Sequence, residues 1–344
     1  MQHKYISFLF LSIAFQFSII NTKTKKQDLG CKFFDLTLHK KINWKSLRIK
    51  KKCKRRSPII QFYTSVNNIG NYLPVLGIQK MLGHKPDVWC IHSFVDFNFI
   101  NKHYKCAIIG GAGLLANCFE SFWQQIRDEC NIPIIIWGIG ICFPDKNKKA
   151  VDKKIISAIA QQCDLINVRD EFTAHYYDLK NVSITACPSI IYLQDLYEEK
   201  KSDNHALYAF HNGLESEEEH QTILKILQKK FPDLLVTNNI QAKKQGLTQI
   251  IKNYYCTSDI VITTRLHGAI IAYGLGIPYI IFARDEKLRS FYQKYKNGFL
   301  VENIQELQEL INNLSSINLQ QIEYEPVLAF GQQARAWVEE KIKI

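Results

Sequence analysis

Ser258-Asp259-Ile260-Val261-Ile262-Thr263-Thr264-Arg265-Leu266-His267-Gly268-Ala269 is the stretch that decides the fold expected for this chain. Its apolar, β-branched beginning is typical of a buried strand, and a helical pattern starts at Leu266. Thr264, Arg265 and His267 therefore stand where a strand passes into the next helix. Ligands of open α/β sheets bind outside the carboxyl ends of the strands, so this junction is the first candidate site.

Strand and helix patterns alternate on both sides of this stretch, which is typical of parallel βαβ units. We expect an α/β chain of two Rossmann-like, doubly wound domains that face each other across a cleft, as in the glycosyltransferase-B architecture. The predicted strands are 59–63, 88–92, 106–110, 133–138, 165–169, 183–187, 207–211, 234–237, 259–264 and 279–282. The predicted helices are 72–82, 119–130, 148–163, 171–178, 217–230, 247–256, 266–275 and 287–295.

Changes in composition give the expected domain boundaries. The polar segment 194–205 is predicted to link a first domain, residues 57–193, to a second, residues 206–330. Residues 331–344 are predicted to form a last helix that packs back across the hinge, and residues 1–56 form a hydrophobic stub with a basic extension.

The formal charge of +12 is concentrated in that extension. Residues 22–56 hold 14 Lys and Arg against two acidic residues, Asp28 and Asp35, whereas residues 57–344 hold 29 basic and 30 acidic side chains. A nearly neutral globular part lacks the electrostatic footprint of a nucleic-acid-binding protein, so we expect no nucleic-acid partner.

The apolar run at residues 5–20 allows three interpretations: a membrane anchor, a signal peptide or a poorly ordered extension. No small-residue cleavage site follows it, and export would carry the basic segment across the membrane, which the positive-inside tendency disfavours. We expect a cytoplasmic enzyme, with the extension able to hold it at the anionic inner face of a membrane.

Cysteines and histidines show none of the paired spacings typical of a metal centre. The ten cysteines are scattered singly, which suits reduced thiols. We predict neither a metal site nor an obligatory cofactor.

The junction at Arg265 is suited to an anion. Free N–H groups and the positive end of a helix attract phosphate or carboxylate, Arg265 can hold two oxygens, and His267 can exchange a proton. Alternatively, Arg265 pairs with a carboxylate of the linker 194–205 and His267 caps the helix.

The motif continues into a longer pattern, and similar glycine and polar motifs follow the first, third and fifth predicted strands. The passage resembles the carboxy-terminal core of polysaccharide pyruvyl transferases, and the likeness extends over most of residues 60–300. It is carried by Ala272, Gly274, Gly276, Ile277, Pro278, Ile280, Asp285, Lys287 and Phe291, by Asn68-Ile69-Gly70-Asn71-Tyr72, by Gly110-Gly111-Ala112-Gly113 and by Val168-Arg169-Asp170.

The resemblance implies transfer of the enolpyruvyl group of phosphoenolpyruvate, as co-substrate, to a sugar of a surface polysaccharide or its lipid-linked precursor, with formation of a pyruvate ketal. The resemblance is carried over to Arg265 and His267 only, as catalytic residues. From their places at strand ends we further predict that the second domain binds the donor through Thr264, Arg265, Leu266, Gly268 and Lys287, and that the first binds the acceptor through Asn68, Gly70, Asn71, Gly111, Gly113 and Arg169. Lys287 could instead be an exposed lysine at the start of a helix. Asn68, Gly70 and Asn71 could instead cap a helix.

Two positions depart from the family pattern, because Asn71 and Cys187 stand where the family often has Asp. Two other functions remain open: a glycosyltransferase that uses a nucleotide sugar on the same fold, and a non-catalytic sugar-binding relative.

Overall fold

The computed structural model describes residues 41–43, 48–50, 57–65, 67–141, 150–197, 205–241, 246–314 and 321–343. The apolar run at 5–20 and most of the basic extension lie outside these residues. Within the extension, β1 (Lys41–Asn43) and β2 (Arg48–Lys50) pair antiparallel. No helix in the described part of the chain is both long and apolar enough to span a membrane.

The first half of the chain forms a sheet of six strands, in the order β4-β3-β5-β6-β7-β8, and every neighbouring pair is parallel. Its inner strands are almost entirely apolar, as expected for a parallel sheet covered on both faces. The strands are β3 (Ile59–Tyr63), β4 (Asp87–Cys90), β5 (Cys106–Gly110), β6 (Ile134–Ile139), β7 (Cys163–Val168) and β8 (Ser183–Ile184). The helices between them are α3 (Ile69–Leu82), α4 (Phe97–His103), α5 (Glu120–Glu129), α6 (Lys153–Gln162) and α7 (Glu171–Tyr176).

The second half forms a parallel sheet of five strands in the order β10-β9-β11-β12-β13. Its strands are β9 (His205–Ala209), β10 (Leu235–Thr237), β11 (Ser258–Thr263), β12 (Tyr279–Phe282) and β13 (Gly298–Val301). The helices are α9 (Glu217–Lys230), α10 (Leu247–Ile250) with a π-helical turn at Ile251–Tyr255, α11 (Leu266–Gly274), α12 (Glu286–Tyr295) and α13 (Ile304–Asn312). The predicted α/β class with two Rossmann-like units is confirmed.

The structure contains elements that the sequence analysis did not predict. These are α4, β13, α13 and α8 (Ser189–Tyr197), and the predicted strand 183–187 ends at Ile184. Helix α8 buries Ile190, Ile191, Leu193 and Leu196, which lie on more than one side of the helix. Its apolar residues therefore do not form the single stripe along one side that predicts an amphipathic helix. Residues 194–197 of the predicted linker are the last turn of this helix, and 198–204 lie outside the described residues.

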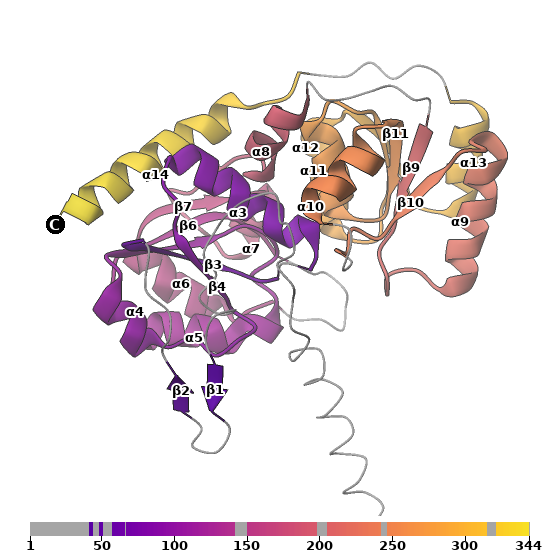
Figure 1. Cartoon of the computed structure of the whole chain (residues 1–344). Helices are drawn as coiled ribbons and strands as arrows, with labels where there is room; N and C mark the ends of the chain where they lie inside the picture. The colour runs from indigo at the N-terminus through magenta and orange to yellow at the C-terminus, as the bar shows by residue number, and fades with distance from the viewer. Residues whose placement is uncertain are drawn as a thin grey trace, which may run out of the picture.

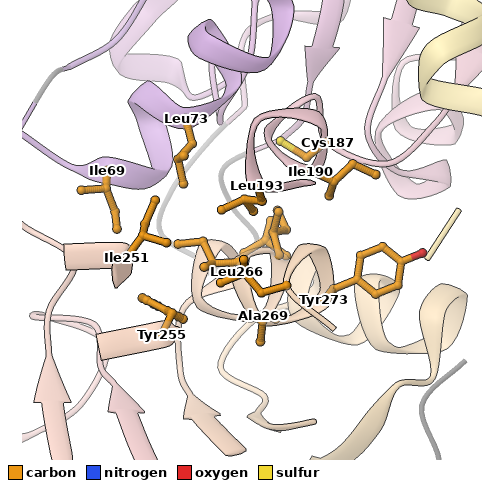
Figure 2. Close-up of a cluster of buried hydrophobic side chains, with 14 of the residues drawn as sticks. Ile69, Leu73, Cys187, Ile190, Leu193, Ile251, Tyr255, Leu266, Ala269 and Tyr273 are labelled. Carbon is orange, nitrogen blue, oxygen red and sulfur yellow. The ribbon is translucent and has the colours of Figure 1, made fainter. Parts of the chain in front are cut away.

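The two halves share one apolar core, formed where α3, α8 and α11 pack together (Figure 2). Ile69 and Leu73 come from α3, Ile190 and Leu193 from α8, and Ala269 from α11. The approach is close, because a Cβ at Gly77 of α3 would collide with the backbone carbonyl of Pro188, just before α8. The relative position of the two sheets is therefore set by buried side chains.

The last helix, α14 (Glu325–Lys343), returns from the second half and lies along α3 of the first (Figure 1). It buries Phe330, Ala334, Trp337 and Val338 against Ile78, Leu82 and Trp137, and the rings of Phe330 and Trp137 meet edge to face at 5.2 Å. The predicted last helix exists, and it begins at Glu325 rather than at residue 331.

We predict that Phe330→Ala lowers the free energy of unfolding by about 3 to 5 kcal/mol, because it leaves a cavity under Trp137. Leu328→Ala on the same helix is the matched control, since Leu328 is 37% exposed, and should change stability by no more than about 0.5 kcal/mol. Urea unfolding followed by circular dichroism measures both. Equal losses in the two variants would contradict the packing of α14.

Candidate active site

The junction between β11 and α11 is held by hydroxyl groups. Thr263 Oγ1 lies 2.8 Å from the carbonyl of Ala209 on β9 and accepts a hydrogen bond from the N–H of Arg265 at 2.9 Å. Thr264 is 0% exposed, and its hydroxyl donates to Glu215 and accepts from the N–H of His211. The Thr264 hydroxyl is therefore bound to Glu215 and to the backbone of His211 and is not exposed to a ligand, which differs from the donor contact that was predicted for it.

Arg265 is 7% exposed and is aimed by a single hydrogen bond, in which its Nε donates to the carbonyl of Phe210 at 2.6 Å. Across the described parts of the chain, its Nη1 and Nη2 have no hydrogen-bond partner. Burial lowers the pKa of the guanidinium, and Tyr255 and Glu215 act in the opposite direction. Glu198, Glu199 and Asp203 of the linker lie outside the described residues, so the alternative pairing of Arg265 with a linker carboxylate stays open. Among the described residues the two terminal amino groups of Arg265 meet no carboxylate, which suits them to an anion.

His267 lies in the first turn of α11, whose N-terminus has no side-chain cap. The imidazole rests on the first turn of α3, because a Cβ at Gly70 would collide with the ring. Two helix N-termini, one from each half, thus meet at this side chain. The predicted acceptor residue Gly70 is required here because any larger residue would displace His267.

The surroundings of His267 favour its neutral form. Burial lowers its pKa well below the ordinary value, and the positive charges of Arg169, Lys287 and Arg265 lower it further. Its Nε2 is buried and has no hydrogen-bond partner within the described ranges. His267 is therefore an uncharged imidazole on which three cations act, which is an arrangement suited to a negatively charged ligand.

A narrow pocket lies between the two halves at Leu266, the residue before His267. Its empty volume of 310 Å³ includes open solvent, and only about 10 Å³ of it admits water. Its walls carry the cations Arg169, Lys287 and Lys294. Leu266, as predicted for the donor site, lines the pocket together with Cys187. Lys287 Nζ lies 2.8 Å from Asp285 Oδ2, and Arg169 Nε lies 3.2 Å from Asp170 Oδ2. Arg169 thus shares the wall with Lys287, although it had been predicted on the acceptor side.

Most of the other predicted residues have packing or capping roles. Asn68 caps α3, since its Oδ1 accepts from the N–H of Gly70 at 3.0 Å, and Asn71 is half-buried in the same turn. The absent Cβ atoms of Gly111 and Gly268 allow close contact with Pro74 and Thr263, respectively. Gly113 is buried after β5. Cys187 is buried, and burial raises the pKa of its thiol, so it does not replace the charge of an Asp.

A short backbone pairing ties the two halves together next to the site. Ile69 N–H donates to the carbonyl of Asn239 at 3.0 Å, and Gln241 N–H donates to the carbonyl of Asn67 at 2.7 Å. These residues follow β3 and β10, so the ends of one strand from each sheet are joined. The pairing holds the N-terminus of α3 against α11.

Two residues of the site were missed by the sequence analysis. His211 follows β9, next to Phe210, whose carbonyl accepts a hydrogen bond from Arg265. Glu215 accepts a hydrogen bond from the Thr264 hydroxyl. His211 stands at the end of a predicted strand, so the rule that singled out Arg265 would also have identified it. Within the described residues, no group of three or more His, Cys, Asp or Glu side chains is placed to hold a metal ion.

Comparisons with known proteins agree with the sequence resemblance. The model of a family described as polysaccharide pyruvyl transferase matches residues 25–286. No curated protein matches the chain significantly.

Solved structures show remote likeness. The UDP-GlcNAc 2-epimerase of Methanocaldococcus jannaschii, in complex with UDP-GlcNAc and UDP, is 10% identical with a TM-score of 0.49, covering 77% of this chain and 94% of the epimerase. A functionally uncharacterised protein from Klebsiella pneumoniae is 16% identical with a TM-score of 0.47, covering 71% of this chain and 92% of that protein. The UDP-GlcNAc 2-epimerase of Neisseria meningitidis, bound to UDP-GlcNAc, is 12% identical with a TM-score of 0.45, covering 83% of this chain and 98% of that one.

The buried histidines predict a loss of stability in acid. The pKa of His211 is lowered to about 4 by burial and by the charges of Arg265 and Lys287, whereas its ordinary value is 6.5. As the pH falls below 6.5 the unfolded chain binds a proton that the folded chain does not, so stability decreases until about pH 4. Melting temperatures compared between about pH 7 and pH 5 should fall less in His211→Asn than in the wild type. His175→Asn, on the exposed surface of α7, should behave like the wild type, and an unchanged slope in His211→Asn would refute the assignment.

Proposed function

Because the chain belongs to the polysaccharide pyruvyl transferase family, we propose that it transfers the pyruvyl group of phosphoenolpyruvate to a sugar and forms a pyruvate ketal. The acceptor is a sugar of a surface polysaccharide or of its lipid-linked precursor. The observation that carries the proposal is the convergence of Arg265, Lys287 and Arg169 on the neutral imidazole of His267.

The charges of the site match those of the donor. Phosphoenolpyruvate carries its carboxylate and its phosphate ester on the same carbon, C2, and Arg265 offers two terminal amino groups to one of these anions. The uncapped N-terminus of α11 offers N–H groups and the positive end of its dipole. Lys287 and Arg169, on the wall of the pocket, supply charge for the second anion. Arg169 is therefore assigned to the donor in this proposal.

Binding of the donor prepares His267 for proton transfer. The imidazole is neutral because of burial and three cations, and a polyanionic ligand opposes the effect of those cations. The pKa of His267 therefore rises when phosphoenolpyruvate binds, and the ring takes up a proton. His267 is then a general acid only in the donor complex.

The proposed reaction is balanced by three proton transfers. His267 protonates C3 of the donor, C2 becomes cation-like, and one sugar hydroxyl adds to C2 while losing its proton. The bond from C2 to the phosphate oxygen then breaks, phosphate leaves, and a neighbouring hydroxyl adds to C2 and loses its proton to close the ring. One hydroxyl proton restores His267 and the other leaves with phosphate. The methyl group of the ketal retains the proton that His267 delivered.

The acceptor reaches the donor from the side of the first sheet in this proposal. Asn71 is half-buried in the first turn of α3, which contacts His267 through Gly70. Attachment to an anionic membrane through residues 1–56 and a cytoplasmic location stay predictions, because that region lies almost entirely outside the described residues.

We predict that the full-length protein, incubated with phosphoenolpyruvate and a panel of lipid-linked or synthetic glycosides, releases phosphate and adds the mass of a pyruvyl ketal to the sugar. Arg265→Ala and His267→Ala should each lower kcat/KM at least about 100-fold, because each removes a group that stabilises or protonates the reacting donor. Colorimetric phosphate release and mass spectrometry of the glycoside measure the two products.

Arg289→Ala is the matched control, because Arg289 lies on α12 in a solvent-exposed ion pair with Glu302. It should keep wild-type activity. If phosphoenolpyruvate neither reacts nor raises the melting temperature, while a nucleoside diphosphate does raise it, the enzyme uses a nucleotide sugar and the proposal is wrong.

The ion pair of Lys287 supplies a further prediction. Lys287→Met should raise the KM for phosphoenolpyruvate, because one of the cations facing the donor is lost, whereas Lys287→Arg should keep most of the affinity. Initial rates at varied donor concentration measure this. An unchanged KM in Lys287→Met would remove Lys287 from the donor site.

A further inference from the structure

His211 is fixed beside Arg265 by the backbone of the segment that follows β9. Its N–H donates to Thr264 Oγ1 at 2.9 Å, and the carbonyl of the preceding residue, Phe210, accepts from Arg265 Nε at 2.6 Å. The end of β9 therefore positions the guanidinium of Arg265 together with the backbone of His211.

A buried network supports this placement. Glu215, whose side chain is 2% exposed, accepts the hydrogen bonds of the Thr264 hydroxyl and of the Tyr208 hydroxyl, the latter at 2.6 Å. His220 Nδ1 lies 3.3 Å from the same carboxylate. Because the Thr264 hydroxyl donates to Glu215, its oxygen can accept the backbone N–H of His211 in only one orientation. The network therefore provides a partner for the backbone of His211, but none for its ring.

The ring of His211 has an unexplained polar atom. Its Nδ1 is buried and has no hydrogen-bond partner in the part of the chain that the structure describes. The charged groups that act on the ring are Arg265, Lys287 and Asp285. A buried nitrogen without a partner is unfavourable, and two of its three charged neighbours are the cations assigned to the donor.

We propose that His211 is a further donor-binding residue, whose Nδ1–H donates a hydrogen bond to an oxyanion of phosphoenolpyruvate held by Arg265 and Lys287. This inference rests on the proposed function and adds a specific contact to it. The donor would satisfy the buried nitrogen, and the nitrogen would fix the orientation of the donor between the two cations.

The charge state of His211 suits this role. Burial, Arg265 and Lys287 lower its pKa to about 4, while the backbone of Asn212 and the carboxylate of Asp285 act in the opposite direction. The ring is therefore neutral near pH 7 and carries one N–H. A neutral imidazole N–H can orient an anion by a hydrogen bond without adding a further positive charge. An additional fixed positive charge would slow the release of the phosphate product.

Three substitutions in the full-length protein test the contact. Asn places an amide nitrogen near the position of Nδ1, Gln reaches toward Nε2 instead, and Ala removes both. Isothermal titration measures the Kd of phosphoenolpyruvate and of inorganic phosphate for each variant and for the wild type. We expect His211→Ala and His211→Gln to weaken phosphoenolpyruvate binding about 10-fold or more, and His211→Asn to recover most of it.

The other outcomes separate the two proposals. If the wild type does not bind phosphoenolpyruvate, the proposed function fails and this contact fails with it. If the wild type binds and His211→Ala binds equally well, only the role of His211 is refuted. If Ala, Gln and Asn weaken binding equally and all lower the melting temperature, His211 is structural and the inference is wrong. His175→Ala, on the exposed surface of α7, serves as the control for a histidine remote from the site.

Discussion

The site depends on one contact, that of the His267 ring with the first turn of α3 at Gly70. Each half of the chain supplies a helix N-terminus, and the contact brings the two together. It requires a residue without a side chain on α3 and a tight apolar junction of α3, α8 and α11 around it. The pairing of residues 67–69 with 239–241 adds a backbone connection at the same place. Neither sheet alone forms the pocket, because Arg169 comes from the first and Lys287 from the second.

Burial gives the charged groups of the site their properties. Thr263 and Phe210 fix Arg265 through its backbone and its Nε, and leave its terminal amino groups without partners among the described residues. The two half-buried histidines are neutral because burial and the neighbouring positive charges lower their pKa. In the proposed function, an anion bound by these cations would raise the pKa of both imidazoles. Affinity for the ligand and the protonation state of the site are therefore coupled.

The alternation of strands and helices could be predicted from the sequence because buried parallel strands are continuous apolar runs, and α9 was predicted at its observed bounds. Helix α8 could not be predicted, because it is apolar on several sides and carries no helical period. Arg265 and His267 were found because a motif marks them. Thr264 was assigned to the ligand, since sequence does not reveal which way a hydroxyl points. That Arg169 shares a pocket with Lys287 could not be predicted, since only the packing of the two halves brings the two residues together.

The return of α14 to the first sheet has a consequence for synthesis on the ribosome. The strands of that sheet emerge first, yet the apolar face formed by Ile78, Leu82 and Trp137 packs against Phe330, Ala334, Trp337 and Val338 of α14. During most of translation this face lacks its cover from α14, and exposed apolar surface of this kind attracts chaperones or other nascent chains. The core of the half that is made first is therefore completed last, and a chain terminated before α14 would leave that core unfinished.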